Sequence, residues 1–199
     1  MIRAIVLAAG RSRRMGTQKL LLPFAGKNVI AHIVDQLLES AVDGVSVVVG
    51  ADAGRVTAAL EGRAVTLILN PDPDSEMLSS VRCGFAQLPP ECGAALIALG
   101  DQPSVNPELI NKLIAEFQTG GRGIVVPVHD NHRGHPMIIA SRYRDEILSS
   151  CHDTGLRGLL NAHSDEVLRV HVSTPAVLDD MDYPQDYQRE LAKLNSTAS

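Results

Sequence analysis

Cysteine is scarce in this sequence of 199 residues. The three cysteines, Cys83, Cys92 and Cys151, are odd in number and lack C-x-x-C spacing. Neither a disulfide framework nor a zinc site is therefore indicated. We interpret Cys83 as a core residue, because it lies on the apolar face of an expected helix. Such cysteine usage favours the reducing cytoplasm.

Long apolar runs and an excess of positive charge are also missing. No apolar run approaches the ~20 residues of a membrane span, and the apolar start at 1–9 lacks the core and cleavage site of a signal peptide. The net charge of −5 gives no reason to expect nucleic-acid binding. We find no repeats or linkers, so we predict one cytoplasmic domain over 1–199 with no membrane or nucleic-acid partner.

Three common functional motifs are absent as well. There is no Gly-x-Ser-x-Gly elbow, which argues against a Ser-His-Asp hydrolase. No Gly-Lys-Ser/Thr sequence completes a P-loop, and the glycine spacing does not match the dinucleotide fingerprint. Any nucleotide site in this chain must therefore be of another kind.

A basic loop follows the first apolar run. Gly10 and Gly16 bracket most of it, and it carries four cations, Arg11, Arg13, Arg14 and Lys19. Glycines let a backbone approach a ligand, while guanidinium forks and an ammonium group suit a polyanion such as a triphosphate. The loop follows a predicted strand, which is where open α/β sheets bind ligands. The alternative is a solvated connection with no ligand.

Apolar runs and helical patterns alternate along the rest of the chain. We predict strands at 2–9, 45–49, 65–69, 94–99, 124–126, 137–139 and 167–172, with a hairpin turn in 129–134. Helices are expected at 29–38, 52–60, 78–88, 107–119, 142–150 and 154–162, with another after 179 and frayed residues at 196–199. This alternation predicts a three-layer α/β/α sandwich with a mostly parallel, Rossmann-like sheet.

Acidic residues occupy two informative places. Asp101 stands just beyond the 94–99 strand, where a carboxylate would suit Mg²⁺ shared with substrate phosphates. The alternative is that Asp101 caps the helix at Pro107 or forms an Asx turn. Asp179, Asp180 and Asp182 cluster near the end, and we select Asp182 as a second metal ligand. A solvated acidic turn is the other interpretation of that cluster.

Five stretches together resemble one family. The chain resembles the molybdenum cofactor nucleotidyltransferases, especially their cytidylyltransferase branch, within the glycosyltransferase-A-like superfamily that also holds the nucleotide-diphospho-sugar transferases. The stretches are Leu7-Ala-Ala-Gly-Arg-Ser-Arg-Arg-Met-Gly with Lys19-Leu-Leu-Leu, Asn70-Pro with Met77-Leu-Ser-Ser, Leu99-Gly-Asp-Gln-Pro, Gly134-His-Pro and Asp180-Met-Asp-Tyr-Pro-Gln-Asp-Tyr.

The resemblance implies roles for particular positions. The backbone of the turn formed by Leu7, Ala8, Ala9 and Gly10 would hold the base and ribose. Arg14 and Lys19 would bind phosphates, and with Asp101 they would form the catalytic set. Asp101 and Asp182 would bind Mg²⁺, the one cofactor expected.

Further matches are looser. Ser79, Ser80 and Arg82 would contact the nucleotide at a helix start. His135 and Arg157 would bind the acceptor, although a lone histidine in a hairpin is often structural or solvated.

Two positions depart from the family pattern. Asp182 precedes Tyr-Pro-Gln-Asp instead of Thr-Pro-Glu-Asp, and Glu76 replaces a glycine before Met77.

The implied reaction is Mg-dependent transfer of CMP from CTP to the phosphate of molybdopterin, with release of pyrophosphate. A phosphate nucleophile is already ionised at neutral pH, so no general base is expected. The implied partners are CTP or another NTP, a molybdopterin-type acceptor and an apo-molybdoenzyme. The alternatives are guanylyl transfer to molybdopterin, a sugar-phosphate nucleotidyltransferase and a non-catalytic carrier of the cofactor. The Ala8-Ala9-Gly10 turn resembles the cytidylyl branch, which favours CTP.

Overall fold

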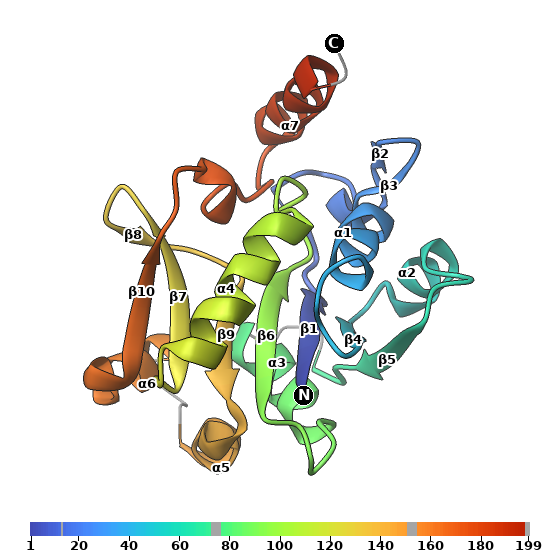
Figure 1. The fold of residues 1–199 in the computed structure, drawn as a ribbon. Helices are drawn as coiled ribbons and strands as arrows, with labels where there is room; N and C mark the ends of the chain where they lie inside the picture. The colour runs from blue at the N-terminus through green and yellow to red at the C-terminus, as the bar shows by residue number, and fades with distance from the viewer. Residues whose placement is uncertain (13, 73–76, 151–154, 198–199) are drawn as a thin grey trace.

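The computed structural model of the chain describes residues 1–12, 14–72, 77–150 and 155–197 (Figure 1). Arg13, Glu76 and Cys151, which entered the sequence predictions, lie outside the described residues.

An eight-stranded mixed sheet forms the centre of the molecule. Its strand order is β10-β7-β9-β6-β1-β4-β5, and β8 pairs with β7 at the side. All neighbours in this order are parallel except β9, which runs antiparallel to both β6 and β7. The bounds are β1 Ile2–Ala8, β4 Val45–Val49, β5 Val65–Leu69, β6 Ala94–Leu99, β7 Ile124–His129, β8 His132–Arg133, β9 Met137–Ala140 and β10 Val167–His171.

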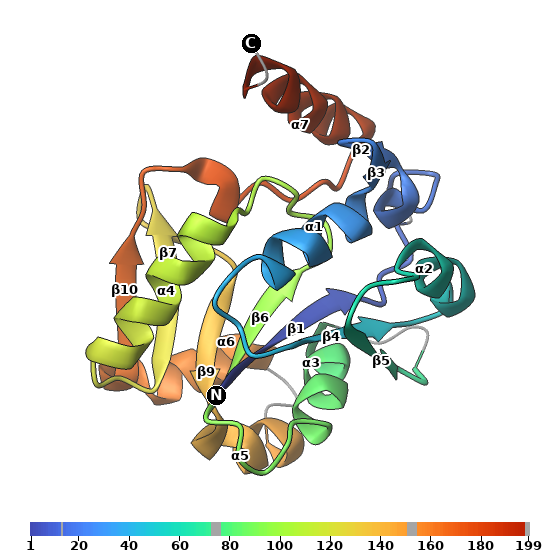
Figure 2. The ribbon, with the colours of Figure 1, turned by 45° about the vertical axis from the view of Figure 1, so that its right-hand side comes forward.

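Helices cover both faces of this sheet (Figures 1 and 2). One face packs against α1 (Val29–Leu38), α2 (Ala53–Ala59) and α4 (Pro107–Thr119). The other packs against α3 (Met77–Ala86), α5 (Arg144–Ser149) and α6 (Gly155–Ala162). The described chain is thus a three-layer α/β/α sandwich, as the sequence predicts.

Short elements and one last helix complete the chain. The last helix, α7 (Pro184–Thr197), projects beyond the carboxyl ends of the parallel strands (Figures 1 and 2). The short elements are the hairpin β2 Pro23–Phe24 with β3 Lys27–Asn28, and the 3₁₀ turns η1 Lys19–Leu21, η2 Ser141–Tyr143, η3 Ser164–Glu166 and η4 Pro175–Val177.

The strand composition explains why the centre is buried. Every residue of β4 and β6 is buried, as expected for apolar strands covered by helices on both faces. The two layers of side chains above and below the sheet form two separate hydrophobic clusters. β5 lies at the edge of the sheet, where Leu67 and Leu69 are exposed.

Several boundaries differ from the sequence prediction by one or two residues, and two further differences stand out. The 124–126 strand continues to His129, because its end pairs with β8 across a tight hairpin at Asp130 and Asn131, whose φ values are positive. Residue Ser196 was expected to be frayed, yet α7 extends through Thr197.

The centre of the sheet places two predicted site segments together. Strands β1 and β6 are parallel neighbours with Leu7 opposite Leu99, so the loops after both strands leave the same edge of the sheet. Gly100 keeps these loops close: its N–H donates to the Leu7 carbonyl at 3.1 Å, and a Cβ there would lie 2.8 Å from that oxygen. For this reason the basic loop, which begins at Gly10, lies next to Asp101.

Candidate active site

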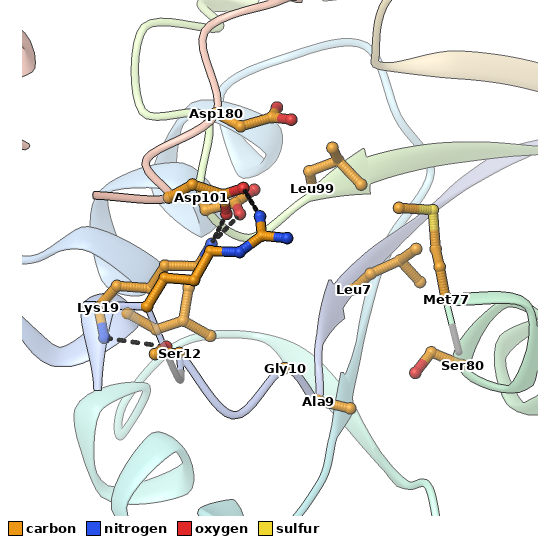
Figure 3. Close-up of a pocket in the computed structure, with 13 residues that line it drawn as sticks. Leu7, Ala9, Gly10, Ser12, Lys19, Met77, Ser80, Leu99, Asp101 and Asp180 are labelled. Carbon is orange, nitrogen blue, oxygen red and sulfur yellow. Dashed lines mark hydrogen bonds and ion pairs between the residues drawn. The ribbon is translucent and has the colours of Figure 1, made fainter. Parts of the chain in front are cut away.

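A cavity of about 430 Å³ lies at this edge of the sheet (Figure 3). It is lined by the ends of β1 and β6, the basic loop, the start of α3 and the segment before α7. The lining residues are Leu7, Ala9, Gly10, Ser12, Arg14, Lys19, Leu20, Met77, Ser80, Leu99, Asp101, Asp180 and Asp182. Segments that are far apart in the sequence thus share one cavity.

The ammonium group of Lys19 joins two carboxylates at one end of this cavity. Its Nζ lies 2.5 Å from Asp101 Oδ2 and 3.0 Å from Asp182 Oδ1. Arg14 Nη1 lies 2.7 Å from the other oxygen of Asp182. The cations and the carboxylates chosen from the sequence therefore meet in space and pair with one another.

Charge pairing also shifts the proton affinities at this end. Burial alone would lower the pKa of Lys19, but Asp101, helped by Asp182, outweighs it and raises that pKa. The hydrogen bond from Lys19 lowers the pKa of Asp182, despite partial burial. Burial, reinforced by the nearby Asp101 carboxylate, raises the pKa of Asp180 to about 6. One end of the cavity is thus rich in closely spaced charge.

The basic loop is held in shape by its own polar side chains. Ser12 has a positive φ, and its Oγ accepts from Lys19 N at 3.2 Å and donates to Gln18 Oε1 at 2.7 Å. Gln18 in turn donates from Nε2 to Asp52 at the start of α2, at 2.7 Å. These bonds position Lys19 toward the carboxylates.

The acidic segment is fixed to the end of β6. Met181 N donates to the Asp101 carbonyl at 3.1 Å, and Gln102 Nε2 donates to Asp180 Oδ1 at 2.8 Å. Asp186, in the first turn of α7, accepts from the backbone N–H of Asp182 at 3.0 Å. The three carboxylates of Asp101, Asp180 and Asp182 therefore line the cavity from two joined segments.

This donor set fits a magnesium ion that is shared with a substrate. Within the described ranges, no three or more His, Cys, Asp or Glu side chains form a group that could enclose a metal. Mg²⁺ is usually held by one or two protein carboxylates plus phosphates and water, and Asp101 and Asp182 offer that arrangement. The capping alternative for Asp101 does not apply to α4, because Asn106 caps that helix, accepting from Leu109 N at 3.0 Å.

A second cavity of about 310 Å³ adjoins the first, with Met77 lining both. Its walls are largely apolar, and it contains the two residues predicted for the acceptor, His135 and Arg157. His135 is partly buried, and its Nε2 is buried without a hydrogen-bond partner among the described residues. Burial lowers the pKa of His135 to about 4, so the imidazole is neutral at pH 7.

Three residues predicted to contact the nucleotide do not line the first cavity. Ala8 packs its side chain into the core, so only its backbone could have the role predicted for this turn. Ser79 Oγ donates to Asn70 Oδ1 at 3.2 Å, and Arg82 Nε donates to the Ile147 carbonyl of α5 at 2.9 Å. None of the three is among the described residues that line the first cavity. The arginine is directed away because it tethers α3 to α5.

Sequence reasoning passed over other residues that line the cavity. Asp180 lines the cavity together with Asp182, and the acidic cluster in the sequence contains both without distinguishing them. Ser12 and Leu20 carried no separate signal, because their place depends on how the loop folds back.

The sequence model of a protein family, the MobA-like NTP transferase domain, matches residues 4–167 of this chain. The chain belongs to this family. In this MobA-like NTP transferase, Lys19 and Asp101 lie within residues 4–167, which the family model matches. Asp180 and Asp182 lie after that range.

Relatives of this family member differ in their named functions. The nicotine blue oxidoreductase of Paenarthrobacter nicotinovorans is 27% identical over 197 residues, 96% of each chain. The bifunctional protein GlmU of Exiguobacterium sibiricum is 34% identical over 143 residues, which are 68% of this chain and 31% of that protein. The chain thus spans only about a third of GlmU.

Solved structures match nearly the whole MobA-like chain. Rv0371c of Mycobacterium tuberculosis has a TM-score of 0.83 and 28% identity, covering 96% of this chain and 97% of its own; it has also been solved with manganese. A nucleotidyl transferase of Methanothermobacter has a TM-score of 0.86 and 26% identity over 99% of both chains. These likenesses and the family support a nucleotidyltransferase. No helix in the described ranges is long and apolar enough to cross a membrane.

Proposed function

We propose that this protein is a Mg-dependent cytidylyltransferase that transfers CMP from CTP to the phosphate of molybdopterin and releases pyrophosphate. One observation supports it above others: Lys19, paired with Asp101 and Asp182, lies in a cavity that shares Met77 with a second cavity. A nucleoside triphosphate and an acceptor would meet at that shared wall. A cytoplasmic location and delivery to an apo-molybdoenzyme belong to the same proposal.

The reaction is an in-line displacement at phosphorus. An oxygen of the acceptor phosphate bonds to the α-phosphorus, the bond from that phosphorus to the α,β-bridging oxygen breaks, and pyrophosphate carries away the electron pair. Lys19 and Arg14 would bind the triphosphate and orient it, and Asp101 and Asp182 would hold the metal. Bound Mg²⁺ supplies neutralisation of the phosphate charge. The chain's contribution is positioning and electrostatics, with no covalent intermediate.

The second cavity supports a flat acceptor over a sugar. Its walls include Met77, Leu78, Met137 and Leu156. Thioethers and aliphatic groups pack well against ring systems, whereas a sugar would need many polar partners for its hydroxyls. The neutral His135 offers one unused ring nitrogen, and Arg157 offers one cation for an acidic group.

Oxidoreductase chemistry is a second candidate function. The relative named nicotine blue oxidoreductase matches 96% of this chain, so its kind of activity is compatible with the whole fold. The apolar second cavity would accept such a ring system as well. The charged cluster around Lys19 favours transfer of a nucleotide, because two carboxylates facing cations serve phosphates and a metal.

Pyrophosphate release tests the proposal. We expect it only with Mg²⁺, molybdopterin and a nucleotide, with CTP the preferred one of the four NTPs. Asp101→Asn should fold normally and lose at least about a hundredfold in kcat/KM, because the amide keeps the shape but removes a metal-binding charge.

The matched control is Asp145→Asn, the same change at an exposed site on α5. It should retain wild-type turnover. Preference for GTP would move the protein to the guanylyl alternative. Binding of molybdopterin without pyrophosphate release would indicate a carrier. Redox turnover of nicotine blue without pyrophosphate release would favour the oxidoreductase.

A further inference from the structure

Asn70, the residue that follows β5, is a buried amide whose orientation the structure defines. Only 3% of Asn70 is exposed. Its Oδ1 accepts from the backbone N–H of Asp72 at 3.1 Å and from Ser79 Oγ at 3.2 Å. Because a backbone N–H can only donate, the side-chain oxygen must face Asp72, and the amide nitrogen must face the other way. That nitrogen donates to Ser80 Oγ at 3.0 Å.

This bond determines which hydrogen-bonding role Ser80 has left. A hydroxyl that accepts from an amide nitrogen must direct its own hydrogen elsewhere. Ser80 is 5% exposed and lines the first cavity. Because Ser80 lines the cavity, a ligand bound there could accept this hydrogen.

Ser80 lies at the end of the cavity away from the charges. Figure 3 shows Ser80 and Ala9 on one side and Lys19, Asp101 and Asp180 on the other. A triphosphate bound by Lys19 would place its nucleoside toward Ala9 and Ser80. Among the described residues that line this end, Ser80 thus offers a side-chain hydroxyl to the base.

We propose, resting on the function proposed above, that Asn70 is a positioning residue for base selection. It holds the Ser80 hydroxyl as a donor to ring atom N3 of cytosine. Cytosine N3 is an acceptor, whereas uracil carries a hydrogen on N3 and would confront the hydroxyl with a second donor. An unmatched buried donor is unfavourable, so CTP should bind at least about tenfold more tightly than UTP.

Calorimetry with CTP, UTP and inorganic tripolyphosphate in Mg²⁺ tests this. Ser80→Ala should bring the CTP to UTP affinity ratio close to one while leaving tripolyphosphate affinity unchanged. Asn70→Asp should reverse the preference, because a carboxylate only accepts and would turn the Ser80 hydrogen away from the cavity. If thermal unfolding shows that Asn70→Asp does not fold, Asn70→Ala replaces it and should reduce the ratio. Ser46→Ala, a buried hydroxyl deletion in β4, is the control and should keep the wild-type ratio.

The outcomes separate this inference from the proposed function. Absence of binding by both CTP and tripolyphosphate to the wild-type protein would contradict the function itself. Binding of CTP with no preference over UTP, or a ratio that Ser80→Ala leaves unchanged, would overturn the role of Asn70 and Ser80 alone. Equal loss of CTP, UTP and tripolyphosphate affinity in Ser80→Ala would indicate a structural effect and also overturn it.

Discussion

Lys19 competes for the same two carboxylates that we propose as metal ligands. Without a ligand, its ammonium group pairs with Asp101 at 2.5 Å and Asp182 at 3.0 Å, where the proposed metal would bind. In the proposed reaction its ammonium group would instead contact a phosphate, while the metal would take its place beside the carboxylates. The side chain is only 12% exposed, so this pairing is screened less than a surface salt bridge.

A single substitution should therefore change two affinities in opposite directions. We predict that Lys19→Ala binds Mn²⁺ alone more tightly, by about threefold or more, because the carboxylates lose their competing cation. The same variant should bind CTP about tenfold or more weakly, because a phosphate contact is lost. Titration of Mn²⁺ by electron paramagnetic resonance and of CTP by calorimetry measures both. A parallel loss of both affinities would contradict this role.

At the residue scale, sequence reasoning succeeded where position along a strand carries information. Asp101 directly follows an apolar strand, and the Gly10 loop follows another, so their proximity could be predicted from parallel-sheet geometry. Asp180 could not be distinguished from Asp182 in this way. Its place depends on the amide of Gln102, 78 residues away, and on burial that no local pattern encodes.

At the scale of elements, the junction of β1 and β6 decides how closely the two site loops approach. Gly100 allows this approach, because a Cβ there would come within 2.8 Å of the Leu7 carbonyl oxygen. This carbonyl oxygen belongs to the backbone, so it cannot move aside as the end of a flexible side chain can. Any side chain at position 100 must therefore separate the strand ends.

We predict that Gly100→Ala destabilises the protein by about 1–3 kcal/mol and lowers turnover, because it moves Asp101 relative to Lys19. Gly93→Ala at the other end of the same strand is the matched control: its Cβ would meet only the Met1 carbonyl oxygen, at 3.4 Å. Urea unfolding and pyrophosphate release compare the two. Equal stability in both variants would show that the strand junction adapts without strain.

The pairing of strands was less predictable than their existence. The apolar runs of β4 and β6 match their predicted bounds, because burial on both faces leaves a continuous hydrophobic signature. The antiparallel insertion of β9 between β6 and β7 was not predicted. In this arrangement Ala140 lies opposite Ala94 and Ile139 lies opposite Ile124. Pairing between residues so far apart in the sequence depends on the assembled sheet.

At the scale of the whole molecule, one partly buried histidine should shape the dependence of stability on pH. Burial lowers the pKa of His135 to about 4, whereas an unfolded histidine titrates near 6.5. Between these values the unfolded chain binds more protons than the folded one. The free energy of unfolding therefore falls as pH drops from about 6.5 toward 4.

We predict that His135 accounts for about 2 kcal/mol of stability lost between pH 7 and pH 5. His135→Asn, which does not titrate in this range, should lose correspondingly less over the same interval. Urea unfolding of both proteins at pH 7 and pH 5 measures the difference, and the other acidic and basic groups cancel in the comparison. If both proteins lose the same free energy of unfolding between pH 7 and pH 5, the imidazole already has access to water in the folded state.

The bond between Lys19 and Asp182 joins side chains 163 positions apart. During synthesis, a ribosome must therefore complete and release nearly the entire polypeptide before the basic loop can meet its last carboxylate. A shortened nascent chain would already contain the central strands but would not yet hold both ligands of the proposed metal. Catalytic competence should thus arise late, as the closing event of maturation, after the surrounding architecture has formed.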